Sequence, residues 1–245
     1  MSERLVIVIP AYNEEETIES VLKEWYKIVE LHHGEGRSRL LVINDGSRDR
    51  TEQILEAFAR EHPLFRYVTQ KNAGHGAAIW TGYRIALKMK ADYIFQTDSD
   101  GQTTVSDFPA FWSRRRQADV VAGQRVTRED GRDRMIVSRV LALLLRIVFR
   151  VTVEDANCPY RLMSRSALQD AMRMVPRQYH LTNVLLSVAF RKQKKEVCLI
   201  PIHFRKRQGG TNSIHIRNII KIGWRSLREF VKLEREYRIR FGGDN

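Results

Sequence analysis

Apolar residues in the first half of the chain recur as short continuous runs, and each run is followed by a stretch with helical spacing. The runs at 5–9, 40–43, 65–69, 92–96 and 119–122 are rich in β-branched and aromatic residues, which is typical of buried strands. Strands that alternate with helices indicate βαβ units. We therefore expect an α/β fold with a mostly parallel sheet and helices on both faces.

Two of the predicted helices carry a start signal. Asn13 is followed three residues later by Glu16, and this capping box predicts a helix that extends to about Leu31. Asp49 with Glu52 forms the same pattern before the next helix. A third helix is expected to open in the glycine-rich stretch near residue 74, and a fourth near residue 106.

Two carboxylates directly follow the predicted strand at 92–96. Asp98 and Asp100 are one residue apart, and Gln102 comes two residues later. Carboxylates this close repel each other unless a cation lies between them, and the amide adds a neutral carbonyl oxygen. The set suits Mg²⁺ or Mn²⁺, which bind through a few carboxylates and the phosphates of a substrate. A polar turn with a helix cap is the alternative explanation of the same residues.

Polar and aromatic side chains follow other predicted strands as well. The residues that follow four of the five strands are Pro10, Tyr12 and Glu14; Asp45; Asp98 and Asp100; and Arg125. In a parallel sheet these positions gather at one edge, where open α/β folds bind ligands. Singly, Tyr12 could be a packing residue, Asp45 a turn former and Arg125 a solvated cation. Their convergence predicts a nucleotide-binding crevice.

The composition of the chain indicates an anionic binding partner. The 245 residues are 43% apolar, which is enough for one domain with a small C-terminal extension. The net charge of +13 favours a nucleotide, a nucleic acid or an acidic membrane surface. Cys158 and Cys198 lack a metal-binding spacing and fit buried thiols in a reducing cytosol. The longest apolar run, 140–145, is far short of the roughly 20 residues of a membrane span, and no signal peptide is expected.

Two later segments have the pattern of basic amphipathic helices. Within 134–150 one helical face carries arginines and the other faces are apolar; these arginines are Arg139, Arg146 and Arg150. Such a helix favours contact with a membrane interface or with another copy of the chain. The segment 214–240 has a similar basic stripe, for which an ordinary helix packed on the domain is an equal alternative.

Several motifs together resemble the family 2 glycosyltransferases with the GT-A fold. They are Pro10-Ala11-Tyr12-Asn13-Glu14, Asn44-Asp45-Gly46-Ser47-Arg48-Asp49, Asn72-Ala73-Gly74-His75-Gly76-Ala77 and Asp98-Ser99-Asp100-Gly101-Gln102. Later stretches resemble the dolichyl- or polyprenyl-phosphate sugar transferases of the mannosyltransferase type: Gly123-Gln124-Arg125, 155–162 and 200–213. The ordered resemblance implies a glycosyltransferase domain at 1–213, with the C-terminal helix at 214–245.

The resemblance also implies a role for each matching residue. The base and ribose of a GDP- or UDP-linked sugar would be held by Pro10, Tyr12, Glu14, Ile43 and Asp45. The ribose and diphosphate would meet Asp98, Ser99 and Asp100, with the metal at Asp98, Asp100 and Gln102. Arg125 and Arg207 would contact the phosphates of donor or acceptor. Asn212-Ser213 stands where many members have Ser-Lys, so a lysine expected to meet a phosphate is missing.

The acceptor decides which residue must act in the reaction. A lipid phosphate has a second pKa of about 6 and is already charged at neutral pH, so positioning by Arg125 and Arg207 would suffice. A sugar hydroxyl needs a general base within hydrogen-bond reach. Glu154 and Asp155 are the obvious acids late in the chain, although Asp155 also matches a family aspartate that is structural or paired with an arginine such as Arg161.

Three classes of function follow from the sequence. The first is a metal-dependent, inverting transferase acting on a polyprenyl phosphate, located in the cytoplasm at the inner membrane face; a homo-oligomer is compatible with the sequence. The second is the same fold acting on a carbohydrate hydroxyl, with Asp155 or Glu154 as base. The third, a non-enzymatic nucleic-acid-binding protein, accounts for the charge but leaves the convergent loops unexplained. We therefore expect no nucleic-acid partner.

Overall fold

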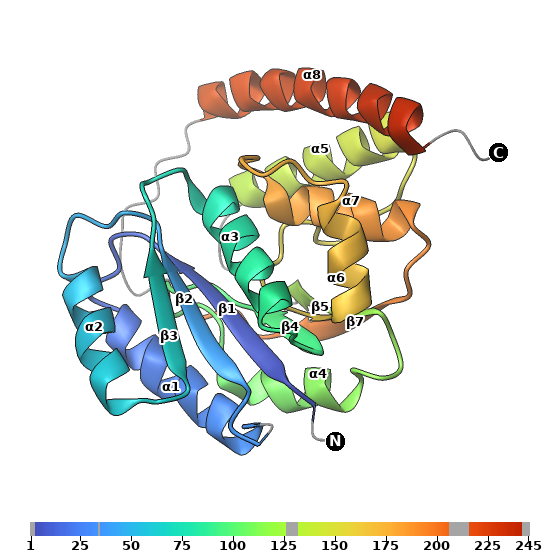
Figure 1. Ribbon diagram of the computed structural model, residues 1–245. Coiled ribbons are helices and arrows are strands. Elements are labelled where there is room, and N and C mark those ends of the chain that lie inside the picture. Colours follow the sequence, from blue (N-terminus) through green and yellow to red (C-terminus); the bar gives the residue numbers. More distant parts are fainter. Residues whose placement is uncertain (1–2, 34, 126–131, 206–215, 242–245) are drawn as a thin grey trace.

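The computed structural model describes residues 3–33, 35–125, 132–205 and 216–241 (Figure 1). The strands are β1 (Leu5–Ala11), β2 (Arg39–Asn44), β3 (Phe65–Thr69), β4 (Tyr93–Gln96), β5 (Val120–Arg125), β6 (Arg161–Ser164) and β7 (Val197–Ile202). The helices are α1 (Ile18–Leu31), α2 (Thr51–Glu61), α3 (His75–Lys88), the 3₁₀ turn η1 (Val105–Asp107), α4 (Phe108–Ser113), α5 (Arg132–Phe149), α6 (Arg165–Met172), α7 (Thr182–Lys192) and α8 (Ile216–Phe241).

The strands form one seven-stranded sheet in the order β3-β2-β1-β4-β6-β5-β7. All five strands that the apolar runs predicted are present, and the mostly parallel sheet is confirmed; β1 pairs in parallel with β2 and β4. The sequence pattern missed β6 and β7. β6 is only four residues long and runs antiparallel to both neighbours, and β7 contains Pro201, which an edge strand tolerates.

The two capping boxes have different outcomes. The box that begins at Asn13 is wrong, because α1 begins at Ile18 and the Asn13 side chain accepts the amide of Arg48 instead. Asn13 itself has a positive φ of 53°, which a helix does not allow. α2 begins at Thr51 close to the predicted place, and the carboxylate of Asp49 accepts the Thr51 amide at 3.0 Å.

Both faces of the sheet are buried, as the continuous apolar strands require. Successive residues of β1 alternate between two hydrophobic clusters: Val6 and Val8 belong to one, and Leu5, Ile7 and Ile9 to the other. The first cluster includes side chains from α3, α5, α6, α7 and α8, and the second includes side chains from α1, α2 and α4. Helices therefore cover both faces of the sheet (Figure 1).

The two amphipathic segments form helices that pack on one another. The segment 134–150 corresponds to α5 and the segment 214–240 to α8, which lies along α5 at one end of the molecule (Figure 1). The ring of Phe149 meets that of fully buried Phe230 at 5.4 Å between centroids. The inner side of α8 thus joins the main core. Within the described residues, no helix is long and apolar enough to cross a membrane.

Candidate active site

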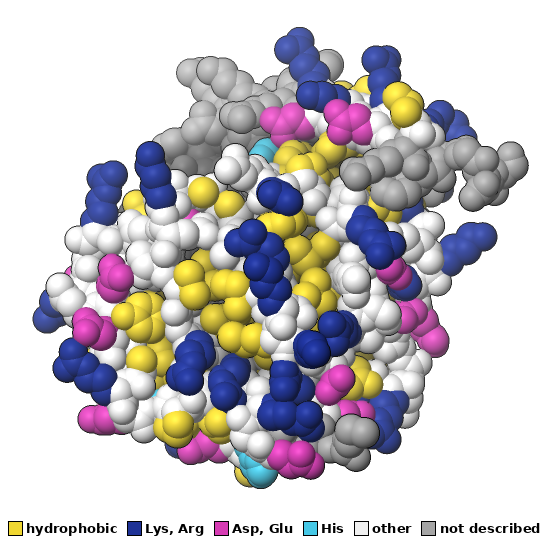
Figure 2. Space-filling view, viewed as in Figure 1, with side chains coloured by type: hydrophobic (Ala, Val, Ile, Leu, Met, Phe, Trp, Pro, Cys, Tyr) yellow, Lys and Arg dark blue, Asp and Glu magenta, His cyan; other side chains and the backbone are white. Residues whose placement is uncertain are grey.

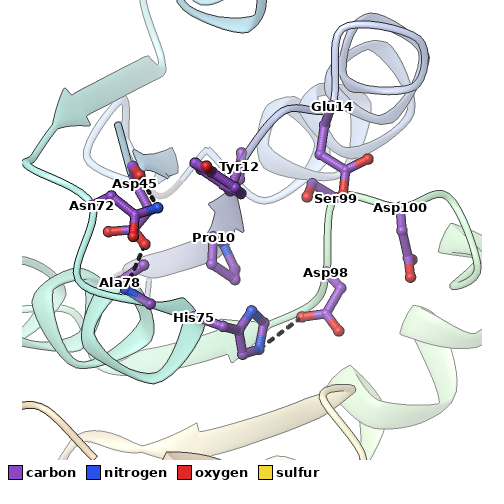
Figure 3. Close-up of a pocket in the computed structure, with 12 residues that line it drawn as sticks. Pro10, Tyr12, Glu14, Asp45, Asn72, His75, Ala78, Asp98, Ser99 and Asp100 are labelled. Carbon is purple, nitrogen blue, oxygen red and sulfur yellow. Dashed lines mark hydrogen bonds and ion pairs between the residues drawn. The ribbon is translucent and has the colours of Figure 1, made fainter. Parts of the chain in front are cut away.

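A pocket of about 380 Å³ lies where β1, β2 and β4 end (Figure 3). Its lining residues are Pro10, Ala11, Tyr12, Glu14, Asp45, Asn72, Gly74, His75, Ala78, Asp98, Ser99 and Asp100. The pocket therefore brings together the residues that the sequence placed after three parallel strands. The loop before α3 and the first turn of that helix close one side.

Asp45 organises the loop that leads into α3. Its side chain is almost completely buried, and its carboxylate accepts the side-chain amide of Gln70 at 2.7 Å. The same carboxylate accepts the backbone amides of Ala73 at 3.0 Å and Gly74 at 2.7 Å. The Asp45 carbonyl accepts the side chain of Asn72 at 2.9 Å. Asp45 thus holds in place a loop that contributes Asn72 and Gly74 to the pocket.

The ionised form of Asp98 is disfavoured in the pocket. About 26% of its side-chain surface is exposed, but its Oδ1 atom is buried and accepts no hydrogen bond from the described residues. His75 Nε2 lies 3.7 Å from this oxygen (Figure 3). Burial raises the pKa of Asp98 above its usual range, and the charge of Asp100 raises it further, while nearby His75, Arg125 and Arg161 oppose the rise. A cation at this oxygen would stabilise the charged form.

The donor set fits a metal ion that is completed by substrate. No three His, Cys, Asp or Glu side chains gather as a metal site within the part of the chain that the structure describes. Asp98 and Asp100 together offer two carboxylates to this pocket, and Mg²⁺ usually takes one or two carboxylates with substrate phosphates. The observation that supports this fit is the buried oxygen of Asp98, which accepts no hydrogen bond from the described residues.

Gln102 lies outside this pocket lining. Its side chain is mostly buried, and its Nε2 atom donates to the carbonyl of Arg205 at 3.3 Å. The Arg205 amide in turn donates to the Gln102 carbonyl at 2.8 Å. Gln102 therefore ties the turn after Asp100 to the segment that follows β7, and its role as a metal ligand stays a prediction.

The other residues predicted to bind the nucleotide sugar lie in different environments. Tyr12 stands at the pocket with 43% of its surface exposed, and Ser99 lines the wall while its carbonyl accepts the hydroxyl of Thr17 at 3.0 Å. The structure does not bring Ile43 into the pocket, because side chains alternate along β2 and this one is fully buried in the core. Arg207 lies outside the described residues.

Arg125 and Asp155 form a pair that the sequence did not identify. At the end of β5, Arg125 donates from Nε to Asp155 Oδ2 at 2.8 Å, and its Nη2 bonds Oδ1. The Asp155 side chain is only 4% exposed. The suggested pairing of Asp155 with Arg161 is wrong, because Arg161 donates to backbone carbonyls such as that of Cys158. A cavity of about 40 Å³ lies beside the pair, between α5 and residues 153–157.

His75 is a pocket residue to which the sequence assigned no role. It is the first residue of α3 and is half exposed. Among the residues that line the pocket, it has the one basic side chain, and its ring points toward Asp98. The sequence did contain a signal for this position of His75. A glycine-rich stretch that opens a helix after a strand places the N-terminus of that helix at the edge of the sheet where ligands bind.

The motifs and the pocket agree with a family comparison. The family model described as glycosyl transferase family 2 matches residues 6–171. The chain belongs to this family. It is therefore a glycosyltransferase, and the alternative of a non-enzymatic protein is excluded.

Known relatives and structures extend the comparison. The glycosyltransferase is 26% identical over 241 residues to a dolichyl-phosphate beta-glucosyltransferase of Trichomonas vaginalis, covering 90% of this chain and 71% of the relative. It is 27% identical over 220 residues to an undecaprenyl-phosphate 4-deoxy-4-formamido-L-arabinose transferase of Pseudomonas fluorescens, covering 88% and 62%. Glucosyl-3-phosphoglycerate synthase from Mycobacterium tuberculosis, solved with Mn²⁺, UDP-glucose and phosphoglyceric acid, superposes with a TM-score of 0.67 at 20% identity, covering 95% and 79%. The GT-A fold is thereby confirmed.

Proposed function

We propose that this glycosyltransferase moves a sugar from a nucleotide donor to a polyprenyl phosphate, with inversion and with a divalent metal, at the cytosolic face of a membrane. The relatives whose names specify dolichyl or undecaprenyl phosphate support this acceptor class. The observation that carries the proposal is the buried pair of Arg125 with Asp155, because it occupies one of the two carboxylates that could act as a base.

The donor fits the pocket that β1, β2 and β4 form. The exposed ring of Tyr12 is available to contact the base of the nucleotide. Asp45 keeps the loop before α3 in place. Asp98 and Asp100 would hold Mg²⁺ or Mn²⁺, which supplies charge stabilisation for the departing diphosphate. His75 lies beside Asp98 and adds a nitrogen donor on the same side of the pocket.

The acceptor fits the region of Arg125. Both carboxylate oxygens of Asp155 accept from Arg125, so this acid is occupied and shielded from an incoming hydroxyl. A phosphate acceptor needs no proton removal at neutral pH. It needs a cation at the site, and Arg125 is held in a defined position by Asp155.

Glu154 supports the second candidate, a carbohydrate hydroxyl acceptor. Its side chain is exposed and accepts a hydrogen bond from the side-chain Nε2 of Gln124 at 3.0 Å, one residue from Arg125. An exposed carboxylate can approach a hydroxyl, so Glu154 is the residue that a base-dependent mechanism would use.

The decisive experiment compares acceptors with radiolabelled UDP- and GDP-sugars. The full chain is incubated with a polyprenyl phosphate, the matching unphosphorylated polyprenol or a soluble oligosaccharide, each with Mn²⁺ or with EDTA. We expect product on the polyprenyl phosphate alone and no product in EDTA. Transfer to the oligosaccharide without transfer to the lipid phosphate would overturn the proposal.

Substitutions near Arg125 separate the two mechanisms. Asp155→Asn should retain substantial transfer wherever the fold survives, because an amide oxygen still accepts from Arg125, and Glu154→Gln should be close to wild type. Arg125→Ala should be severely impaired. A hydroxyl acceptor would reverse the ranking, since loss of the base lowers the rate by roughly 10² to 10⁴. Initial rates are measured after circular dichroism has shown that each variant is folded.

A further inference from the structure

Three arginines lie at the beginnings of three neighbouring strands. Arg4 directly precedes β1, Arg39 is the first residue of β2, and Arg66 is the second residue of β3. Because these strands pair in parallel, the arginines lie at the edge of the sheet where the strands begin. The pocket proposed for the donor lies at the opposite edge, where the strands end. The arginines are therefore separate from the residues assigned to the donor and the metal.

The register of the strands places the three side chains on one face of the sheet. Val6 pairs with Arg39, and Leu41 pairs with Arg66. Val6 and Leu41 both belong to the hydrophobic cluster on the α3 face. Arg4 and Arg39 lie two residues before them on the same strands, so they share this face with Arg66. Spacings of about 3.3 Å along a strand and about 4.8 Å between strands put neighbouring arginines roughly 8 Å apart at Cα.

No carboxylate neutralises these arginines within the described part of the chain. Glu3, the acid next to Arg4 in the sequence, pairs instead with Arg115 at 2.6 Å. Asp92 accepts the backbone amide of Arg4 at 2.7 Å and forms no ion pair with its guanidinium group among the described contacts. The three positive charges therefore face one another without an acid between them.

The guanidinium groups also keep donors available for a ligand. Arg39 donates from Nη1 to backbone carbonyls, among them that of Gly36 at 2.6 Å. Arg66 likewise donates from Nη1 to the carbonyl of Phe65 at 2.9 Å. The Nε atom of Arg4 is buried and has no hydrogen-bond partner among the described residues. Buried donors are nearly always satisfied, so one without a protein partner indicates that a ligand or water completes it.

The charges of the cluster oppose one another. Partial burial lowers the pKa of Arg39 below its usual range, and the charges of Arg66 and Arg4 lower it further. Two exposed lysines, Lys88 and Lys90, end α3 and lead toward β4 at the same edge. Figure 2 shows Lys and Arg side chains gathered over the lower part of this face, where Figure 1 places the beginnings of the strands.

We propose that Arg4, Arg39 and Arg66 form a second anion site, which binds the diphosphate group of a small molecule. Guanidinium groups bind phosphate oxygens in a bidentate manner, and a compact group with several negative charges matches three converging cations. The basic helices α5 and α8 lie at the other end of the molecule, so the cluster is not a continuation of them (Figure 1). A nucleic acid would require a basic stripe along its backbone instead of one compact cluster.

Calorimetric titration of the full chain with inorganic pyrophosphate in EDTA tests the site. EDTA removes the metal that the acids of the donor pocket would need to hold a diphosphate. We expect one bound pyrophosphate per chain, with binding weakened by added salt. Arg39→Gln and Arg66→Gln should each weaken it by about tenfold, the effect of losing one charge-assisted hydrogen bond. Asp98→Asn, which alters the donor pocket, should bind pyrophosphate like wild type.

UDP is titrated in parallel to separate two sources of a diphosphate group. Tighter binding of UDP than of pyrophosphate, with the same loss in Arg39→Gln, would identify a nucleotide as the ligand of this site. The reverse order would identify the free anion. UDP binding that Arg39→Gln leaves unchanged, together with no binding of pyrophosphate, would place the diphosphate in the donor pocket and overturn the second site.

Thermal stability distinguishes a binding role from a structural one. Without an anion, Arg39→Gln and Arg66→Gln should keep or raise the thermal midpoint, because each removes repulsion between like charges. Arg66 is exposed, so its substitution leaves the core intact. Pyrophosphate should raise the midpoint of wild type and change those of the variants much less. A lower anion-free midpoint in both variants would assign the arginines a structural role and overturn the proposal.

Arg235→Gln is the matched control for a general effect of charge. It removes the same charge from an exposed position on α8 and should bind pyrophosphate like wild type. Equal weakening by Arg235→Gln, or no binding of pyrophosphate to wild type, would overturn the site. Binding of random duplex DNA that Arg39→Gln abolishes, without binding of pyrophosphate, would assign the cluster to nucleic acid and equally overturn it.

Discussion

At the scale of single residues, Asp98 shows how a binding group opposes folding. Its buried oxygen has no hydrogen bond from the described residues, and burial together with Asp100 raises its pKa. A raised pKa means that the folded protein favours the protonated form more than the unfolded chain does. Ionised Asp98 is therefore a destabilising group in the folded protein, and a ligand that provides positive charge would relieve it.

Asp98→Asn tests this directly. We expect the thermal midpoint of the metal-free protein at neutral pH to stay the same or to rise, because the neutral amide removes the unfavourable charge, while transfer is abolished. Differential scanning fluorimetry and an activity assay measure the two effects. Mn²⁺ with a nucleotide should raise the midpoint of wild type and leave that of the variant unchanged. Wild-type turnover that persists in EDTA, or a large fall in the variant's midpoint, would contradict this account.

Asp45 and Tyr12 should differ in how they affect nucleotide binding. Asp45→Asn keeps one acceptor oxygen but loses the charge that holds the amides of Ala73 and Gly74, which costs about 1–3 kcal/mol. Calorimetry should show weaker nucleotide binding, and hydrogen exchange should become faster at those two amides. Tyr12→Ala should weaken nucleotide binding with no change in exchange there. Unchanged nucleotide affinity in both variants would remove them from the donor site.

At the scale of elements, the start of α3 is shaped by packing as well as by the pocket. A Cβ atom at Gly76 would lie 2.0 Å from the Tyr179 carbonyl oxygen and 2.7 Å from the Thr182 hydroxyl. Thr182 donates this hydroxyl to the Gly76 carbonyl at 3.2 Å. The glycine-rich stretch thus lets α3 approach the beginning of α7 closely, and this contact holds the helix that presents His75.

Gly76→Ala should therefore destabilise the protein. The added methyl meets backbone atoms that cannot move aside, and overpacking of this kind costs about 1–3 kcal/mol or more. Gly36→Ala is the control, because a Cβ there meets nothing within 4 Å and only its positive φ of 75° opposes the change, at about 1–2 kcal/mol. Urea denaturation compares the free energies of unfolding. A Gly76→Ala protein as stable as wild type would show that α3 and α7 pack less closely.

At the scale of the whole molecule, the core contains several groups that ionise only in alkali. Burial raises the pKa of the Cys158 thiol to about 12 and raises those of the Tyr83, Tyr160 and Tyr237 hydroxyls. Tyr160 donates its hydroxyl to the carbonyl of Thr104 at 2.9 Å. The folded protein keeps these protons at a pH where the unfolded chain has begun to release them.

The stability of the protein should consequently fall as the pH rises. The unfolded chain binds fewer protons than the folded one above the ordinary cysteine and tyrosine pKa values of about 8.5 to 10, so the free energy of unfolding decreases there. Urea midpoints should be steady near neutrality and drop progressively above about pH 9, with recovery on return to neutral pH. Tyr160→Phe or Cys158→Ala should make the drop shallower. A constant midpoint through this range would contradict the buried, protonated state of these groups.

The sequence alone determined the parallel part of the sheet and the edge at which the site lies. Short β-branched runs such as 5–9 and 40–43, alternating with helical stretches, indicated buried parallel strands, so the residues that follow them could be placed at one edge of the sheet. The positions of Tyr12, Asp45 and Asp98 at one pocket follow from this local information, and the ordered motifs indicated the family. Short β6 and proline-containing β7 lacked such a pattern and were missed.

The tertiary structure decided which groups meet across long distances in the chain. Asp155 pairs with Arg125, thirty residues away, and His75 faces Asp98 from a different strand–helix unit. The side of β2 on which Ile43 is buried depended on which helices cover that face. Asn13 lies outside α1, contrary to the prediction, because its side chain accepts the backbone amide of Arg48 in the loop before α2. Local propensity is set by neighbours in sequence, whereas ion pairs, pKa shifts and burial depend on the chain segments that folding brings together.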